Sequence, residues 1–572
     1  MKRLISILLL LALLVPTLAA CGKTAPVSTT SPDAEATATE PAGSQSESGT
    51  TVATATAGPD KWETIAPKIR ALAARDRQLT IECSNAKSAE KSSKNDIYMK
   101  GPDAVEDGVT PTIQQMIYYR NKAADELLGT TTSYVFWDEG FNDQADKIDL
   151  VVKGNASNAP DLFVNMIYNL NRALLNANFK DIWSIPGGFF DFASEGWLKM
   201  WMENMSFTND RAYILGGDYF LDVMRAMTAL PFNVTMMDEN AAKLAAPIIG
   251  DDGDPLGAGE QLSTRFFDFV DEGKWTYDVL AKFCAAIWED TDGDGQDSIR
   301  DRLGIIADEY GGIHSASFIY SCGEQLTTAD PIDDPESEYN NKQWIRYAED
   351  PTVLNSIFDA VATVFAGPGS MSTSYPFGGN TPEQPGAAYH HTKFAASELL
   401  FAGVCTLGAL EDEVFQMMDD LYSVVPCPTV EAGRPYNTII INQGDAGSIN
   451  VNANPRKARV LSAYVQYCTE HSPAILDQFL MFVTKYKTTT YNQGTDRMLD
   501  IIYDGVLYDR DKTVEDMNNE PRWHKLMKQQ HFEAGASFIA SQYESALPAK
   551  QKLLDRTMEK WYSLPKVETE TN

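Results

Sequence analysis

One stretch near the middle of the chain constrains its fold more than any other: an acidic, glycine-punctuated loop that ends at Gly304. Counted from Asp290, oxygen-bearing side chains occupy positions 1, 3, 5 and 9, glycine occupies position 6 and a carboxylate occupies position 12. A hard divalent cation takes about six to eight oxygen ligands, and the glycine permits the sharp turn. The sequence therefore predicts a structural calcium site with these ligands: Asp290, Asp292, Asp294, Gln296 and Asp301.

The residue at position 12 leaves an alternative open. A glutamate there usually binds calcium with both oxygens, whereas Asp301 has a shorter side chain and a shorter reach. A solvent-exposed acidic turn without a metal is therefore the competing interpretation. Calcium binding is the interpretation that we adopt.

The residues around the loop predict a helix before it and a strand after it. Thr276 is a candidate N-cap, Asp278 lies in the first turn, and apolar residues recur at helical spacing as far as Ile287. Leu303–Ile306 then has the composition of a buried strand. No second strongly periodic helix follows at once, so we expect a helix–loop–strand site that fastens a helix to a strand, and not a paired calcium sensor.

The N-terminus has the pattern of an export signal followed by a lipid anchor. Met1–Arg3 is basic, Leu4–Val15 is apolar, and Leu18–Cys21 reads LAAC, the pattern at which lipoprotein signals are cleaved. The apolar run is too short to span a bilayer. We expect residues 1–20 to be a signal peptide and Cys21 to carry lipid; a plain signal peptide with a chance cysteine is the alternative.

Residues 21–61 predict a flexible stalk. This stretch is rich in Ser, Thr, Ala, Pro, Gly and Glu and has almost no large apolar residue. It therefore cannot bury enough apolar surface to offset the conformational entropy that ordering would cost. As a random coil it would span roughly 30 to 40 Å. The mature protein is therefore expected at the outer face of the cytoplasmic membrane, held there by its lipid alone.

Composition excludes some partners and leaves the cysteines undecided. The net charge of −33 argues against nucleic acid and anionic lipid surfaces as partners, because proteins bind both through clustered Lys and Arg. The cysteines other than Cys21 are scattered singly, so most are expected to be buried thiols, although one or two disulfides are compatible with export. They are Cys83, Cys284, Cys322, Cys405, Cys427 and Cys468.

The order of elements predicts an α/β fold. Leu79–Ser84, Ser133–Trp137 and Asp161–Val164 have strand composition, and Lys61–Arg77 and Thr112–Leu128 have helical periodicity. Strands that alternate with helices favour mainly parallel pairing. Because roughly 510 residues remain after the stalk, at least two lobes are expected.

Several segments resemble a known family in their order along the chain. GKWT, then DTDGDGQDSIRDRLG, then an apolar strand is similar to the extracellular solute-binding lipoproteins of bacterial ABC importers, within the carbohydrate-type, maltose-binding-like branch. Leu230–Asn233 resembles that branch's FNK strand, with Val234 in place of lysine. Tyr422–Pro428 resembles its exit strand, and Asp496–Ile502 its late MLD segment.

The resemblance implies an architecture and a function. It implies a bilobal periplasmic-binding-protein-like fold, in which a hinge of crossing strands joins two α/β lobes. Residues 62–229 are expected to form the first lobe, 230–430 the second lobe with the calcium loop 290–301, and 431–572 a segment that contributes to both. The implied function is to capture a carbohydrate and deliver it to the permease of an ABC transporter. The ligand is expected to be an oligosaccharide, and the protein is expected to be a monomer.

The resemblance also implies where the ligand lies. Ser84 and Asn85 follow the first strand and are expected to face the ligand. Flat aromatic rings cover the C–H faces of sugars while polar neighbours bond the hydroxyls, although ordinary core packing is the alternative for any one aromatic. The expected ligand-binding residues are Trp183, Trp197, Trp201, Asn233, Tyr320, Trp344, Tyr375 and Tyr389.

Signatures of catalysis are missing from the sequence. It contains no GxSxG, HExxH or Walker A motif, and only six histidines. A binding protein without enzymatic activity is therefore expected. A calcium-stabilised surface glycoside hydrolase or lyase is the alternative, because a pair of carboxylates leaves no sequence signature. A third interpretation is a receptor of the same fold that binds peptides or another nutrient, or one that serves sensing.

Overall fold

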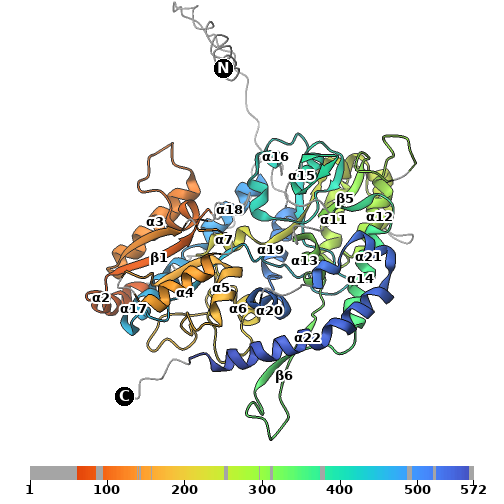
Figure 1. Ribbon diagram of the computed structural model, residues 1–572. Coiled ribbons are helices and arrows are strands. Elements are labelled where there is room, and N and C mark those ends of the chain that lie inside the picture. Colours follow the sequence, from red (N-terminus) through yellow and green to blue (C-terminus); the bar gives the residue numbers. More distant parts are fainter. Residues whose placement is uncertain are drawn as a thin grey trace, which may run out of the picture. The chain divides into compact units, whose positions relative to one another are not determined.

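A mostly parallel sheet of four strands combines three strands from the N-terminal part of the chain with one from its C-terminal half (Figure 1). Its order is β14–β3–β1–β2; β1 pairs in parallel with both β2 and β3, and β14 runs antiparallel to β3. Strand β3 is buried along its whole length, as expected of a strand with both faces covered. The strands are β1 (Gln78–Ser84), β2 (Thr131–Trp137), β3 (Leu162–Met166) and β14 (Asp445–Ile449).

A second, mixed sheet is built from the middle of the chain. Strand β5 is parallel to β8 and β11, whereas β4 is the antiparallel partner of β11, β12 and β13. The predicted α/β class is therefore confirmed by two separate sheets. The strands are β4 (Thr228–Asn233), β5 (Leu303–Asp308), β8 (Ser370–Thr373), β11 (Leu399–Phe401), β12 (Cys405–Thr406) and β13 (Tyr422–Val425).

The computed structural model describes residues 61–85, 94–137, 139–140, 143–155, 158–249, 255–295, 297–308, 313–373, 380–485, 493–518 and 523–565. Two short hairpins complete the strands: β6 (Thr327–Pro331) with β7 (Gln343–Tyr347), and β9 (Asn380–Thr381) with β10 (Gln384–Pro385). Within these ranges no helix is both long enough and apolar enough to cross a membrane.

Helices connect the strands and enclose the two sheets. Those before β5 are α2 (Lys61–Ala73), η1 (Asp96–Lys100), α3 (Thr112–Leu128), α4 (Gln144–Gly154), α5 (Ile167–Leu174), α6 (Lys199–Met205), α7 (Leu221–Arg225), α8 (Val234–Glu239), α9 (Ala241–Leu244), α10 (Ala246–Ile249), α11 (Leu262–Asp271) and α12 (Tyr277–Ile287). Those after β5 are α13 (Ile313–Tyr320), α14 (Thr352–Phe365), α15 (Ala387–Ala395), η2 (Leu407–Glu411), α16 (Glu413–Gln416), α17 (Pro455–Glu470), α18 (Pro473–Lys485), α19 (Gln493–Asp504), α20 (Arg510–Asn518), η3 (Trp523–Leu526), α21 (Gln529–Ala534) and α22 (Ala536–Ser563).

Four short segments run side by side where the chain passes between the sheets. They are residues 226–228, 405–407, 438–441 and 505–507, and we call them the hinge segments. The Thr228 N–H donates to the Ile439 carbonyl at 3.0 Å, and the Leu407 N–H donates to the Met227 carbonyl at 2.8 Å. The Thr438 N–H donates to the Gly505 carbonyl at 2.8 Å. Crossing segments between two sheets are the joint that the expected bilobal fold requires.

The buried hydrophobic side chains form two clusters. One includes Leu79, Ile81 and Val164 of the first sheet and extends to Leu303 of β5, and the other includes Leu280 of α12. Every cysteine in the described chain is a buried free thiol. Burial of apolar area on both sheets is the dominant stabilising term for such a fold.

The predicted helix–loop–strand unit is present. Helix α12 begins after Thr276, whose hydroxyl makes no capping hydrogen bond, and β5 follows the acidic loop. The helix lies so close to the strand that a Cβ built on Gly304 would come 2.4 Å from the Cα of Cys284. Only glycine fits at this point of helix–sheet contact.

Candidate functional site

Polar side chains gather at the carboxyl edge of the first sheet. Ser84 ends β1, Asn165 lies near the end of β3, and Asp445 begins the antiparallel β14 at the same edge. All three are fully buried. In open α/β sheets, ligands bind outside the carboxyl ends of the parallel strands, so this edge is the first place to look for a site.

Hydrogen bonds join these residues in two sets, and the pairing of β3 with β1 and β14 places the two sets side by side. We call them together the edge cluster: Glu82, Ser84, Asn95, Asn165, Asn169 and Asp445. The Asn95 amide donates to the Ser84 carbonyl at 3.0 Å and also to the Asp445 carboxylate. The Asn165 amide donates to Glu82 at 3.2 Å, and the Asn169 amide donates to Asn165 at 3.2 Å. The cluster therefore connects β1, β3, β14 and the first turn of α5.

Three oxygens of the edge cluster are buried without a protein partner. Among the described residues, nothing hydrogen-bonds to Ser84 Oγ, Asn95 Oδ1 or Asn169 Oδ1. Buried polar atoms are nearly always paired, and each unpaired one costs about 1–3 kcal/mol. These oxygens are therefore suited to bond the hydroxyl groups of a ligand or an ordered water.

Glu82 is a fully buried carboxyl group of the edge cluster. Burial raises the pKa of Glu82 well above its usual range; the Asn165 amide and the charge of Lys147 oppose this increase only in part. Burial thus favours the protonated form of this carboxyl group, which can donate as well as accept a hydrogen bond. The amides and the hydroxyl of the edge cluster suit an uncharged, hydroxyl-rich ligand.

A group of charges lies beside the edge cluster and the hinge segments. We call Lys94, Asp222, Arg225 and Glu411 the hinge ion cluster; the side chain of Lys94 is 38% exposed, and the other three are buried. Arg225 pairs with Asp222 and, through Nε at 2.6 Å, with Glu411, which also pairs with Lys94. The Asp445 N–H donates to Asp222 at 3.1 Å, which links the two clusters. A cavity of about 30 Å³ beside the hinge ion cluster is lined by Asp222, Arg225, Ala226, Thr406, Gly408, Ile441, Gln443 and Gly444.

Helix α20 carries buried charges towards both sheets. Its Asp511 accepts the Tyr320 hydroxyl of α13 at 2.7 Å, and its Glu515 accepts Lys550 of α22 at 2.8 Å. Its Asp516 accepts the Asn442 amide at 2.8 Å, and the Asn442 carbonyl in turn accepts the Tyr168 N–H of α5 at 2.9 Å. Burial and repulsion by Asp511 raise the pKa of Glu515 to about 8. The helix therefore forms a polar layer between the elements of the two sheets.

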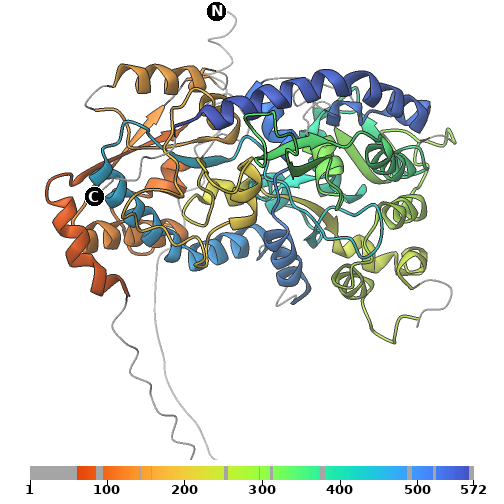
Figure 2. The same cartoon turned by 90° about the horizontal axis from the view of Figure 1, so that it is seen from below.

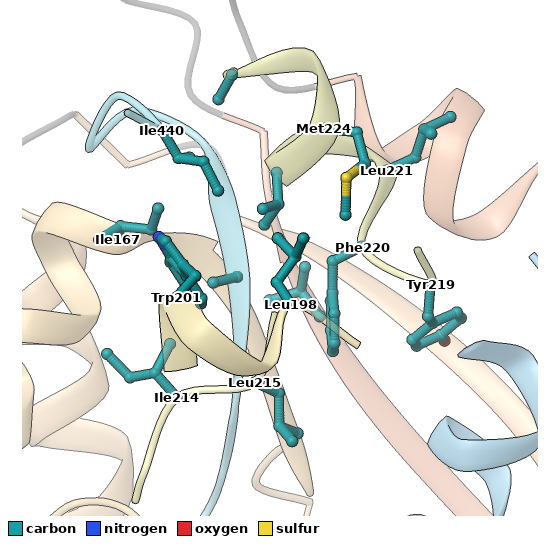
Figure 3. Packing of buried hydrophobic residues seen from close by; sticks show 14 of the residues in the cluster. Ile167, Leu198, Trp201, Ile214, Leu215, Tyr219, Phe220, Leu221, Met224 and Ile440 are labelled. Atoms are coloured by element: carbon teal, nitrogen blue, oxygen red, sulfur yellow. The ribbon is translucent and has the colours of Figure 1, made fainter. Parts of the chain in front are cut away.

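The tryptophans expected at the ligand lie in or beside the core. Trp201 is fully buried and lies near Ile167, Leu198 and Ile214 (Figure 3). The Trp197 ring is nearly buried and donates from Nε1 to Gln466 at 3.1 Å. Trp183 is partly buried against the same core. Contact of these rings with a ligand stays a prediction.

The other expected ligand residues are scattered. Asn233 caps α8 and donates to Asp420 at 2.9 Å, and Trp344 donates to Asp555 at 2.9 Å. Tyr320 belongs to the α20 layer, and Tyr389 is half-buried on α15. The structure thus brings only Tyr320 to a polar layer between the sheets. Three of the predicted positions lie outside the described residues: Cys21, Gln296 and Tyr375.

Sequence reasoning missed most of the edge cluster. Asn165 and Asn169 stand in the stretch NMIYNLN that follows a predicted strand, and Asp445 begins a strand that was not expected. A polar residue at the end of a parallel strand is the signal that could have found Asn165. Asn95 and Asp445 are 350 positions apart in the chain, and only the fold brings them together.

The acidic loop has a geometry that fits a divalent cation. Oxygens of Asp290, Asp292 and Asp294 lie within 4.8 Å of one another, close enough to reach one ion. Asp301 is buried and accepts the N–H groups of Thr291 and Ser298, both at 2.8 Å. Burial would raise the pKa of Asp301, but these bonds lower it. Asp301 thus closes the loop, and the half-buried Asp290 with the exposed Asp292 and Asp294 form the candidate ligand group.

Comparison with known proteins finds likeness in structure alone: no protein-family model and no curated protein matches the chain. The GacH receptor of Streptomyces glaucescens is 12% identical, with 82% of this chain and 98% of that one covered at a TM-score of 0.44. The galacto-N-biose-/lacto-N-biose I-binding protein of Bifidobacterium longum is 11% identical, with 86% and 98% covered at 0.45. MalE of Xanthomonas citri is 8% identical, with 85% and 99% covered at 0.46. The sequence resemblance predicts this class, the sugar-binding proteins of ABC transporters.

Proposed function

We propose that this protein is a lipid-anchored, extracellular solute-binding protein that captures a carbohydrate between two lobes and delivers it to the permease of an ABC transporter. One observation carries the proposal: the edge cluster presents buried, unpartnered oxygens at a carboxyl sheet edge that adjoins the hinge segments. A site beside a joint is where closure of two lobes can enclose a ligand.

The chemistry of the site favours an uncharged polyol. The unpartnered atoms of Ser84, Asn95 and Asn169 are hydroxyl and amide oxygens, which suit sugar hydroxyls. The adjoining charges of Arg225 are already neutralised by Asp222 and Glu411, so they offer nothing to an anionic ligand. An oligosaccharide is the ligand we propose, with the aromatic residues named from the sequence as further contacts.

Closure supplies the mechanism. A ligand that bonds both lobes stabilises the closed form by its differential affinity for that form, and the permease recognises it. ATP is hydrolysed by another subunit of the transporter. Lipid on Cys21 and the stalk of residues 21–61 keep the monomeric protein at the outer face of the cytoplasmic membrane.

Calcium is proposed as a structural cofactor of the acidic loop. An ion held by Asp290, Asp292 and Asp294 would fix the connection between α12 and β5, which lies far from the edge cluster in the sequence. Its role is stability of the second sheet, and it does not enter the binding of the carbohydrate.

Thermal melting against a sugar panel tests the function. Residues 21–572 with Cys21→Ser, which removes the lipid, are melted with calcium and with mono- and oligosaccharides. A ligand that binds only the folded state at a hundredfold excess over its Kd stabilises it by about 2.7 kcal/mol. We expect one or more sugars to raise Tm and to be recovered intact. A sugar recovered in cleaved form would establish the hydrolase or lyase alternative instead.

A further inference from the structure

A long arm extends from the elements of the second sheet. It consists of the β6–β7 hairpin and α22, the dark-blue helix that is seen lengthwise in Figure 2. The Tyr543 hydroxyl of α22 donates to the Ala348 carbonyl at 2.5 Å, and Gln551 accepts the Tyr347 N–H at 3.0 Å. Helix α22 also packs on α14. We call the hairpin and α22 the C-terminal arm.

The far end of the arm is a single packed unit. The Tyr562 ring stacks on Trp344 of β7 with centroids 6.1 Å apart and planes at 12°. The Tyr562 hydroxyl donates to the Gln343 carbonyl at 2.7 Å. The hairpin and the end of α22 therefore move together. Pro548, inside α22, removes one helical hydrogen bond before this end and gives the helix a place to bend.

This end is inserted among residues of the first sheet. Trp561 is fully buried, with Phe207 at 5.0 Å and Tyr213 at 5.2 Å between ring centroids. Its Nε1 donates to the Thr208 hydroxyl at 2.9 Å. The Tyr213 carbonyl accepts the hydroxyl of Ser448, a residue of β14, at 3.0 Å. The pocket that receives Trp561 is thus attached to the first sheet.

A buried arginine strengthens the insertion. The guanidinium of Arg211 donates to the carbonyl of Trp561 at 3.3 Å and to that of Leu564 at 3.5 Å. These carbonyls end α22, where backbone acceptors lack helical partners and a cation is favoured. Arg211 also pairs with Asp210 at 3.1 Å, which keeps its charge compensated.

We propose that the C-terminal arm is a latch: Trp561, seated between Phe207, Thr208 and Tyr213, holds the two sheets together, and they separate only when it leaves this pocket. The proposal rests on the hinge closure given above as the function. A helix that packs on α14 among the elements of the second sheet and is inserted into the first at Trp561 resists rotation about the hinge segments. The latch therefore favours the closed arrangement even without a ligand.

Distance measurements on the protein without sugar test the latch. Spin labels go on Leu150→Cys of α4, where the native side chain is 73% exposed, and on Lys282→Cys of α12, where it is 56% exposed. The native thiols described above are buried. In residues 21–572 with Cys21→Ser, Trp561→Ala should lengthen and broaden the distribution of distances between the labels. The matched control is Trp62→Ala, which removes an equally buried, hydrogen-bonded tryptophan within the first sheet's own core.

A second variant provides the test if Trp561→Ala does not fold. Thr208→Val removes only the hydroxyl that accepts Trp561 Nε1, and it should shift the distribution in the same direction by a smaller amount. The latch would be overturned if Trp561→Ala folds and gives the same distribution of label distances as the parent protein. If Trp561→Ala does not fold, the same result for Thr208→Val would overturn it. Because no sugar is present, a failed sugar panel and a failed latch give separate results.

Discussion

Asp509 is a buried carboxylate at the start of α20, and its protonation couples stability to pH. It accepts the Asp511 N–H at 2.7 Å. Burial, with repulsion by Asp511, raises its pKa from 3.8 to about 7. The folded state therefore binds the proton more tightly than the unfolded state, so the free energy of unfolding falls as pH rises from about 4 to about 7.

Asp509→Asn should remove this loss, because an amide keeps the acceptor oxygen and carries no charge. We expect the Tm of the variant to equal that of the parent protein near pH 4, to rise above it as the pH approaches 7, and to keep a constant advantage beyond. Asp350→Asn, at a fully exposed carboxylate, is the control without such a gain. A difference in Tm that does not change between pH 4 and 8 would contradict the assignment.

The acidic loop gives a second prediction at this scale. Asp292→Ala and Asp294→Ala should lower Tm in calcium and should match the parent protein when a chelator is present, because each removes one of the three clustered carboxylates. Glu272→Ala, at a carboxylate that is 57% exposed outside the loop, is the control. Affinity for the sugar in calcium should hardly change. Equal melting of the parent protein with and without chelator would rule out the ion.

At the scale of elements, Gly304 determines how closely α12 approaches β5. Gly304→Ala places a methyl group 2.4 Å from the Cα of Cys284, and overpacking of this kind costs about 1–3 kcal/mol. Gly154→Ala, at a helical position with nothing within 4 Å, is the matched control and should be neutral or stabilising. Urea unfolding measures both. Equal stability of the two variants would show that the helix can move away without cost.

The hinge ion cluster makes the joint sensitive to the loss of one residue. Arg225→Met leaves the carboxylates of Asp222 and Glu411 buried with less compensation, and breaking a buried pair in this way costs about 3–5 kcal/mol. Arg265→Met, in a pair whose side chains are 31% and 29% exposed, should cost about 0–1 kcal/mol. Urea denaturation measures the free energy of unfolding of both variants. Equal losses of stability in Arg225→Met and Arg265→Met would contradict the role of the hinge ion cluster.

Long amphipathic elements were predictable and the site was not. Helix α3 spans Thr112–Leu128 as its periodicity predicts, because helical spacing of apolar residues is a local signal. The contact of Asn95 with Asp445 depends on the order of strands in the first sheet, which no local pattern contains. Trp201 illustrates a further limit: aromatic side chains serve both cores and sugar sites, so a tryptophan-rich stretch cannot distinguish them.

At the scale of the whole molecule, the last part of the chain joins what the earlier parts build. The hinge segments connect the two sheets through backbone hydrogen bonds, α20 contributes buried charges between them, and the C-terminal arm joins them again at Trp561. The two sheets are therefore held together by residues that are distant in sequence.

Ser84 offers the most direct test of carbohydrate capture at the edge cluster. Its hydroxyl has no partner among the residues that the structure describes, so Ser84→Ala should leave the Tm of the free protein unchanged or slightly higher. Ser462→Ala is the matched control, because that hydroxyl accepts the Phe189 N–H at 2.9 Å and donates to the Arg459 carbonyl at 2.7 Å.

Both variants and the parent protein are melted with the sugar panel. The proposed function predicts that a sugar raises the Tm of the parent protein and of Ser462→Ala, and that this increase shrinks or disappears in Ser84→Ala. No increase with any sugar, or an equal increase in Ser84→Ala and the parent protein, would contradict carbohydrate capture at this edge.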